Sequence, residues 1–413
     1  MGSRGKATMT KRIVPKSFFL ITLVSAAFGA IAPAFSEQES ASPPREFNGL
    51  ALTPPMGWNS WNSFRCDVSE QVIRETADAM VSSGMRDAGY EYIAIDDCWQ
   101  VSRGEHGRIQ PDATKFPSGM KALADYIHSK GLKFGIYSDT GRHTCSGRPG
   151  SQGYEFQDAK QYADWGVDYL KYDWCDSGTR DMLEANTLMS DALRASGRPI
   201  VFSICPGKST PWLWGKAIAN VWRTSGDIGD SWDVWDNVHG GLGVMTILDT
   251  QVGLEAFSGP GYWNDPDMLV VGLGGMTETE YRAHFSLWAM LAAPLIAGND
   301  LRKMDESTMT ILLNKEIIAI DQDPLGRQAS RVAKNGDREV WARPLASGGR
   351  AVLFLNRGSA TSDISIGWPA LGYPTHLRAR VRDLWAHKDR PAATGRITAS
   401  VKSHEAVVYR IEP

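Results

Sequence analysis

Cysteine and histidine are scarce in this chain of 413 residues, and its charges nearly cancel. Five Cys and eight His occur, with no CxxC pair and no HExxH motif, so a zinc site is not expected. The 44 Lys and Arg against 47 Asp and Glu leave a net charge of −3, with no basic excess to neutralise nucleic-acid phosphates. No G-x-S-x-G elbow occurs, and no G-x-G-x-x-G follows the first expected strand. A nucleic-acid partner, a dinucleotide-binding fold and an elbow-type serine hydrolase are therefore not expected.

Long apolar runs are missing except near the start. Lys11 and Arg12 precede an apolar stretch that ends at about Ala32, among small residues of the kind found at signal-peptidase sites. We therefore expect residues 1–35 to be a cleaved signal peptide and 36–47 a disordered leader. The mature protein would then be exported, to the periplasm or the medium, without a membrane anchor. An uncleaved anchor is the alternative, because the stretch is nearly long enough to span a bilayer.

From about residue 50 to 325, the sequence alternates short apolar runs with segments of helical periodicity such as 118–130. Each run has the length of a strand. The expected strands are residues 56–58, 92–95, 133–137, 167–172, 199–203, 221–223, a segment near 261–263, and 295–297. Eight strand-then-helix units in this length predict a (β/α)8 barrel, placed at 48–326, with a doubly wound open sheet as the alternative.

The pattern changes after Gly326. Alternating, β-branched or aromatic runs follow, separated by Gly, Asn, Asp and Pro, and no segment of helix length interrupts them. These runs are residues 339–344, 351–356, 362–368, 378–385 and 397–411. They predict a small antiparallel β-sandwich domain over 327–413, with a stabilising or ancillary role.

Ionisable residues gather where the expected strands end, and this rim is where (β/α)8 barrels carry their active sites. They are Asp96, Asp97, Asp139, Lys171, Asp173, Arg223, Asp227, Asp265 and Asp267. A single Asp at such a position is equally well explained as a helix N-cap. Carboxylates at several strand ends, with a Lys and an Arg among them, instead predict a site for a polar ligand, because so much charge at one rim is costly unless something binds there.

Two carboxylates that face one another from different strands can hydrolyse a glycosidic bond. One attacks the anomeric carbon, and the other protonates the leaving oxygen and then activates water. Asp173 and Asp227 are the candidates for this pair. A divalent-metal hydrolase built on the Asp cluster is the alternative chemistry.

Neighbouring acceptors and aromatic rings add to the case for a sugar ligand. The adjacent carboxylates of Asp96 and Asp97 suit neighbouring hydroxyl groups of one sugar. The chain has fifteen Trp, and an indole ring can lie against the C–H face of a sugar, although a buried Trp is the commoner case. We expect Trp61 and Trp99 to supply an apolar wall.

The segments that carry these residues resemble glycoside hydrolase family 27, which comprises α-galactosidases and α-N-acetylgalactosaminidases. The likeness extends from about residue 50 to 330 and continues weakly beyond. The matching stretches are 52–61 (LTPPMGWNSW), 89–99 (GYEYIAIDDCW), 133–139 (KFGIYSD), 164–173 (DWGVDYLKYD), Trp222-Arg223 with Asp227-Ile228, 261–269 (GYWNDPDML) and 321–326 (DQDPLG). Motifs of this length in this order are highly specific.

The resemblance implies a retaining exo-glycosidase that releases terminal α-linked galactose without a metal or an organic cofactor, with Asp173 as nucleophile and Asp227 as acid/base. Positive charges nearby should keep Asp173 ionised while Asp227 stays protonated, which predicts a bell-shaped pH profile on the acid side of neutral. The other residues of the implied sugar-binding set are Asp96 and Asp97 (O4 and O6), Lys171 (O3 and O4), Arg223 (near O2), and Trp61, Tyr137 and Asp267 (pocket lining).

The resemblance also implies the disulfides of the family and its partners. Cys66 would pair with Cys98 and Cys145 with Cys175, which leaves Cys205 free. A small carbohydrate substrate is the expected partner. The oligomeric state stays open, with a homodimer among the alternatives.

One departure from the family pattern concerns C2 of the sugar. After the fifth strand, α-galactosidases usually read Cys-Glu-Trp, with the Glu beside the 2-hydroxyl group, and the N-acetylgalactosaminidases place Ser there. This chain has Pro206 at that position, which leaves Lys208 or Ser209 to take over the contact. An α-N-acetylgalactosaminidase, a β-L-arabinopyranosidase of the same fold and a catalytically silent carbohydrate-binding protein are therefore the alternatives to an α-galactosidase.

Overall fold

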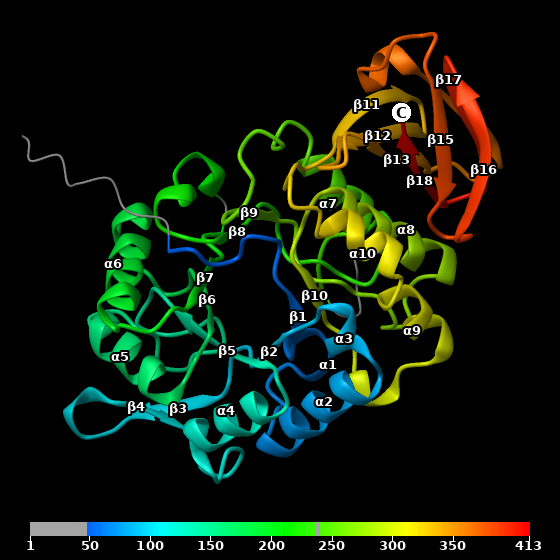
Figure 1. The fold of residues 1–413 in the computed structure, drawn as a ribbon. Coiled ribbons are helices and arrows are strands. Elements are labelled where there is room, and N and C mark those ends of the chain that lie inside the picture. Colours follow the sequence, from blue (N-terminus) through cyan, green and yellow to red (C-terminus); the bar gives the residue numbers. More distant parts are fainter. Residues whose placement is uncertain (1–47, 208, 236–239) are drawn as a thin grey trace, which may run out of the picture. The chain divides into compact units, whose positions relative to one another are not determined.

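The computed structural model describes residues 48–207, 209–235 and 240–413, and Figure 1 shows its ribbon. The expected signal peptide (1–35) and leader (36–47) lie outside the described residues. Within the described ranges, no helix combines the length and the apolar character needed to cross a bilayer.

Eight parallel strands of the described chain form one sheet, which curls into a ring in Figure 1. In sheet order they are β10 (Leu295–Ala297), β1 (Met56–Asn59), β2 (Tyr92–Ala94), β5 (Lys133–Asp139), β6 (Tyr169–Asp173), β7 (Val201–Ile204), β8 (Val221–Arg223) and β9 (Trp263–Asp265). A parallel bridge between Leu269, beyond β9, and Ala297 of β10 closes the ring. The predicted (β/α)8 barrel is confirmed, and its strands lie close to their expected positions.

Helices surround the ring and pack apolar faces against its strands (Figure 1). Helix α2 buries Ile73, Ala77 and Met80 at helical spacing, and its N-cap Ser69 accepts a hydrogen bond from the Val72 N–H. The helices are α1 (Trp61–Phe64), α2 (Glu70–Ser82), α3 (Met85–Ala88), α4 (Gly119–Ser129), α5 (Glu155–Trp165), α6 (Met182–Ala195), α7 (Val244–Thr250), α8 (Glu278–Met290), α9 (Glu306–Leu312) and α10 (Lys315–Asp321).

The connection between β7 and β8 departs from the expected strand-then-helix pattern. Its described residues form two 3-10 turns, Pro211–Leu213 and Gly215–Ala217, where an α-helix is expected. Pro211 removes one backbone donor, and Gly215 lies so close to Trp222 that a Cβ would meet its ring at 2.7 Å. A short segment with these two residues keeps the chain against the barrel without completing a regular helix.

A hairpin inserted after β2 is held to the barrel by a buried ion pair. It consists of β3 (Gln100–Arg103) and β4 (Ile109–Pro111). The Arg103 guanidinium donates to both carboxylate oxygens of Asp158 on α5, at 2.8 and 2.7 Å. Asp158 is fully buried; burial raises the pKa of its carboxyl group, and the Arg103 charge opposes that rise. The bidentate contact therefore compensates a charge that the interior would otherwise disfavour.

The C-terminal residues form antiparallel sheets around a second apolar core, which includes Phe354 and Trp368. The strands are β11 (Ser330–Asn335), β12 (Arg338–Pro344), β13 (Arg350–Asn356), β14 (Ser362–Gly367), β15 (Arg378–Asp383), β16 (Lys388–Thr394), β17 (Arg396–Val401) and β18 (Ala406–Glu412). One sheet has the order β11-β12-β13-β18-β15-β16, and β14 pairs with β17. The predicted antiparallel architecture is confirmed.

The sequence did not predict β11 and β16, and it merged β17 with β18. Both missed strands lie at the edges of the six-stranded sheet. Strand β16 is exposed along nearly its whole length and contains Pro391, so it has neither the apolar alternation nor the composition of a central strand.

We predict that Arg103→Met lowers the free energy of unfolding by about 3–5 kcal/mol, because it leaves Asp158 buried without its partner. As the control, Lys121→Met breaks an exposed ion pair with Asp125 and should cost about 0.5 kcal/mol or less. Urea unfolding of both variants beside the wild type measures these values. Equal and small losses in the two variants would show that Arg103 contributes no more than a surface pair.

Candidate active site

One pocket at the carboxyl ends of the barrel strands brings together the candidate catalytic pair and the sugar-binding residues that the resemblance implies. These lining residues are Trp61, Asp96, Asp97, Tyr137, Lys171, Asp173, Arg223, Asp227 and Asp267. The lining also includes residues that the sequence analysis did not single out, among them Asn62, Arg65, Trp235, Leu242 and Met268. Most of these are uncharged loop residues, so only their place after a strand end marks them.

The expectation that Trp99 helps to wall the pocket is wrong. Trp99 is fully buried and packs edge-on against Tyr162 and Trp165. Its indole N–H donates to the Tyr137 carbonyl oxygen at 2.8 Å. The ring therefore packs between β5 and helix α5 as part of the core, which is the common role of a buried Trp.

Asp173 ends β6, and its carboxylate is held from two sides. Oδ1 accepts a hydrogen bond from the Trp174 backbone N–H at 2.9 Å, and Oδ2 accepts one from the Tyr137 hydroxyl at 3.1 Å. Burial raises the pKa of Asp173 above its usual value, and the positive charge of Lys171 opposes that rise. The two hydrogen bonds fix the direction in which the carboxylate faces.

Lys171 lies two residues before Asp173 on β6, so both side chains project from the same face of the strand. Its Nζ is 2.8 Å from Oδ2 of Asp96, an oxygen that also accepts a hydrogen bond from Asn59 Nδ2 at 2.8 Å. Burial disfavours the charged form of Lys171, but Asp96 and Asp173 outweigh it and raise the pKa of Lys171 above its usual value. A buried ammonium group is thus shared between carboxylates of β6 and the loop after β2.

Asp97 is as buried as Asp96 and connects two loops of the rim. Oδ1 accepts from the Cys98 N–H at 2.7 Å, and Oδ2 accepts from the Ser146 N–H at 2.9 Å. These bonds hold the loop after β2 against the loop after β5. Each oxygen retains a further lone pair with which to accept a hydrogen bond from a ligand hydroxyl.

Arg223 ends β8 and links two carboxylates. Its Nη1 is 3.0 Å from Oδ1 of Asp267, and its Nη2 is 3.0 Å from Oδ1 of Asp227. Asp267 also accepts the Ile228 N–H at 2.8 Å, and its backbone is left-handed, with φ of 84°. Such strain in a non-glycine residue needs support and is typical of functional sites. The Asp227 side chain, in contrast, is 77% exposed.

The pKa directions of the two candidate catalytic carboxyls are opposite to those predicted. Arg223 lowers the pKa of Asp227, whereas burial raises the pKa of Asp173. The sequence shows that both cations lie near the rim, but it does not show that Asp227 pairs directly with Arg223 or how deeply Asp173 is enclosed.

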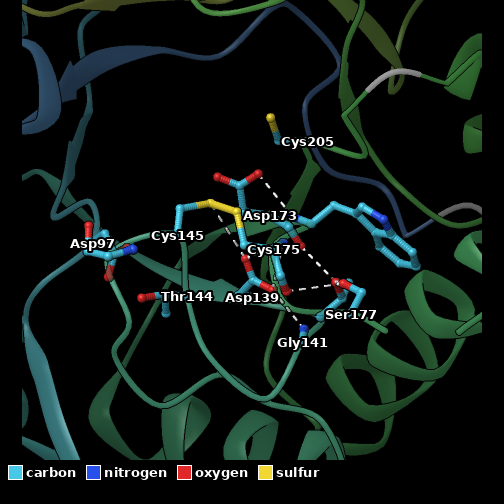
Figure 2. Close-up of a disulfide and its surroundings, with 12 residues drawn as sticks. Asp97, Asp139, Gly141, Thr144, Cys145, Asp173, Cys175, Ser177 and Cys205 are labelled. Carbon is cyan, nitrogen blue, oxygen red and sulfur yellow. Dashed lines mark hydrogen bonds between the residues drawn. A yellow bond between two sulfur atoms is a disulfide. The ribbon is translucent and has the colours of Figure 1, made fainter. Parts of the chain in front are cut away.

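Two disulfides join loops of the rim. Cys66 is bonded to Cys98, and Cys145 is bonded to Cys175, which is the pairing that the resemblance implies. Figure 2 shows the second of these bonds. Cys205 is free and buried. Because Cys175 comes two residues after Asp173, the second disulfide holds the loop that follows the candidate nucleophile.

Asp139, at the end of β5, positions the same loop. Its Oδ1 accepts the Gly141 N–H at 2.7 Å and its Oδ2 accepts the Cys175 N–H at 2.9 Å (Figure 2). Burial raises the pKa of Asp139 to about 8. Gly141 is needed here, because a Cβ would lie 1.9 Å from the Cys175 carbonyl oxygen. Strand-end position alone does not distinguish this supporting role from contact with a ligand.

Four potential metal ligands cluster around the Cys145–Cys175 disulfide, but they do not form a metal site. Ligand atoms of Asp139, Cys145, Asp173 and Cys175 lie within 4.8 Å of one another. The two sulfur atoms are bonded to each other, so neither can act as a thiolate ligand. The carboxylates that remain are already engaged by backbone N–H groups.

The substitutes expected at C2 of the sugar are not seen in the described lining. Pro206 is buried at the end of β7, and Ser209 is not among the described residues that line the pocket. Lys208 lies outside the described residues.

Comparisons with known proteins agree with this geometry. Residues 53–323 match the family model described as alpha galactosidase A, and residues 335–411 match the alpha galactosidase C-terminal beta sandwich domain. Alpha-galactosidase A of Cellvibrio japonicus is 56% identical over 328 residues, which cover 78% of this chain and 81% of that protein. Alpha-galactosidase I from Mortierella vinacea matches with a TM-score of 0.86 at 39% identity, over 89% of this chain and 98% of that one.

A second solved structure, the Saccharomyces cerevisiae α-galactosidase with raffinose, matches with a TM-score of 0.83 at 33% identity, over 89% of this chain and 99% of that one. The barrel and its paired carboxylates define a glycoside hydrolase. The chain belongs to the α-galactosidase family, glycoside hydrolase family 27.

We predict that Lys171→Met lowers kcat/KM by about 100-fold and moves the acidic limb of its pH profile to higher pH. Removal of the ammonium group takes away the charge that opposes the raised pKa of Asp173, so the carboxylate is protonated at a higher pH than in the wild type. The pH dependence of kcat/KM with an aryl α-galactoside measures the shift.

The control for this experiment is Lys121→Met, which removes an exposed ammonium group on α4, outside the pocket. Its pH profile should coincide with that of the wild type. An acidic limb that stays in place or moves to lower pH in Lys171→Met would contradict the predicted influence on Asp173.

Proposed function

We propose that this protein is an exo-acting, retaining α-galactosidase. The observation that carries the proposal is a single pocket in which Asp173 and Asp227 lie beside the buried group of Asp96, Asp97 and Lys171. The first two supply a nucleophile and a proton donor, and the buried group supplies charged partners for hydroxyls. A pocket, as opposed to an open groove, favours the terminal sugar of a chain.

The reaction has two displacements at C1 of the galactosyl unit. An Asp173 oxygen attacks C1, and the C1–O bond to the leaving group breaks as Asp227 gives its proton to the leaving oxygen. Asp227 then takes a proton from water, whose oxygen attacks C1 and releases the Asp173 carboxylate. Two inversions give net retention. Tyr137 and Trp174 hold the nucleophile through both steps.

Arg223 controls when the proton donor is ready. Its contact with Asp227 lowers the pKa of that residue. We infer that substrate draws Asp227 from Arg223 to the leaving oxygen, so its pKa rises. Asp267, 3.0 Å from Nη1 of Arg223, continues to neutralise the guanidinium after Asp227 turns away.

Selectivity for galactose follows from the buried group. Galactose differs from glucose in its axial O4, and the paired Asp96 and Asp97 with Lys171 form a set of charged partners for hydroxyls at this end of the pocket. A sugar whose O4 is equatorial would leave one of these charged groups without a hydroxyl partner. The resulting loss of binding free energy is far larger than that of a lost surface contact.

We also propose that the protein is exported. The apolar stretch within 1–35 has the form of a signal peptide, and disulfides persist in oxidising compartments. In an oxidising compartment outside the cytoplasm, both disulfides between the rim loops would stay intact.

We predict turnover of p-nitrophenyl α-galactoside with retention, and at least about tenfold lower kcat/KM for the α-N-acetylgalactosaminide and for the β-L-arabinopyranoside. Asp173→Asn should lower kcat by at least about 10³-fold, because it removes the nucleophile. Release of the nitrophenol measures the rates, and NMR of the first-formed sugar anomer measures retention.

Asp168→Asn is the matched control. Asp168 lies just before β6, at the end of the strand opposite Asp173, and it pairs with His128 and Arg198. It should keep kcat within about twofold of the wild type. EDTA should leave all rates unchanged, whereas a metal hydrolase would lose activity. Preference for the acetamido substrate would show that Pro206 opens the C2 side, and the proposed function would then change.

A further inference from the structure

Trp235 is an exposed indole at the catalytic pocket that the mechanism above does not use. Its side chain is 57% exposed, whereas Trp58, Trp222 and Trp288 are completely buried. It lines the same pocket as Asp173 and Asp227. A large aromatic ring held in water at a binding site is typical of a surface that a ligand covers.

Trp235 belongs to the loop that carries the proton donor. The loop runs from β8 to α7, and its two arms are joined by hydrogen bonds: the Leu242 N–H donates to the Asp227 carbonyl at 2.7 Å, and the Gly229 N–H donates to the Leu242 carbonyl at 2.9 Å. Gly240, on the second arm, faces the indole, since a Cβ there would lie 3.9 Å from Trp235 Cζ2. The ring is therefore next to the arm that is bonded to the proton donor.

The position of the proton donor decides where the leaving group lies. Asp227 protonates the oxygen that joins galactose to its leaving group, so that group must lie on the Asp227 side of the pocket. A pyranose leaving group there presents a C–H face of a size that an indole can cover.

The other tryptophan among the described lining residues, Trp61, is less suited to this role. The Arg65 guanidinium lies 5.1 Å from its ring centroid and covers one face of the ring. Trp61 is the first residue of α1, after β1, so it does not belong to the loop that carries Asp227. The leaving group is thus expected over Trp235.

We propose that Trp235 is the stacking platform for the first sugar of the leaving group when that sugar is a pyranose. The proposal rests on the proposed α-galactosidase function. It makes Trp235 a residue that determines specificity for the leaving group without touching the reacting atoms.

Steady-state kinetics with raffinose and with methyl α-galactoside test the proposal, because only raffinose has a pyranose next to galactose. Trp235→Ala should lower kcat/KM for raffinose about three- to tenfold, mainly through KM, and the loss for methyl α-galactoside should be at least severalfold smaller. Trp235→Phe, which keeps an aromatic face, should recover most of the raffinose activity.

Val234→Ala is the matched control. Val234 is 71% exposed and adjacent in sequence, but it is not among the described residues that line the pocket. Its kinetics should match the wild type with both substrates. Unchanged raffinose kinetics in Trp235→Ala, or equal losses with both substrates, would contradict the proposed stacking role of Trp235. If the wild type hydrolyses neither substrate, the α-galactosidase function itself is overturned.

Discussion

Parallel pairing of the eight barrel strands is the constraint on which the site depends. All strands of a parallel ring end at the same rim, so side chains that follow strands as distant as β2 and β9 line one pocket. The register of β5 against β6 sets Tyr137 opposite Lys171 and Asp139 opposite Asp173. That register explains why the hydroxyl of Tyr137 reaches the candidate nucleophile and why Asp139 supports the loop beyond it.

Shared charges make a rim with so many acids compatible with a stable barrel. Lys171 is placed between Asp96 and Asp173, and Arg223 between Asp227 and Asp267, so each of these two cations serves two carboxylates. A buried charge without a partner would cost several kcal/mol. The contacts that stabilise the folded rim therefore also determine the pKa of the groups that carry out the chemistry.

The sequence was sufficient to predict the barrel and the charged residues of the pocket, because apolar strands followed by acids mark the rim. It could not separate the residues that contact ligand from those that support them: Asp139 binds backbone, and Trp99 is packed behind the strands. It also missed Trp235, a single aromatic residue in a long loop with no periodic pattern. The pKa order depended on a direct Arg223–Asp227 contact, which only the folded geometry reveals.

The link between Cys145 and Cys175 has a consequence for how the enzyme is produced. In a reducing cytosol this bond does not persist, and the loop beyond Asp173 is then held mainly by the hydrogen bonds of Asp139 to Gly141 and Cys175. A preparation made there lacks this covalent constraint on the loop that follows Asp173. The concentration of active sites should therefore be measured by titration with a mechanism-based inactivator. The maximal rate should be divided by that concentration, and not by total protein, to obtain kcat.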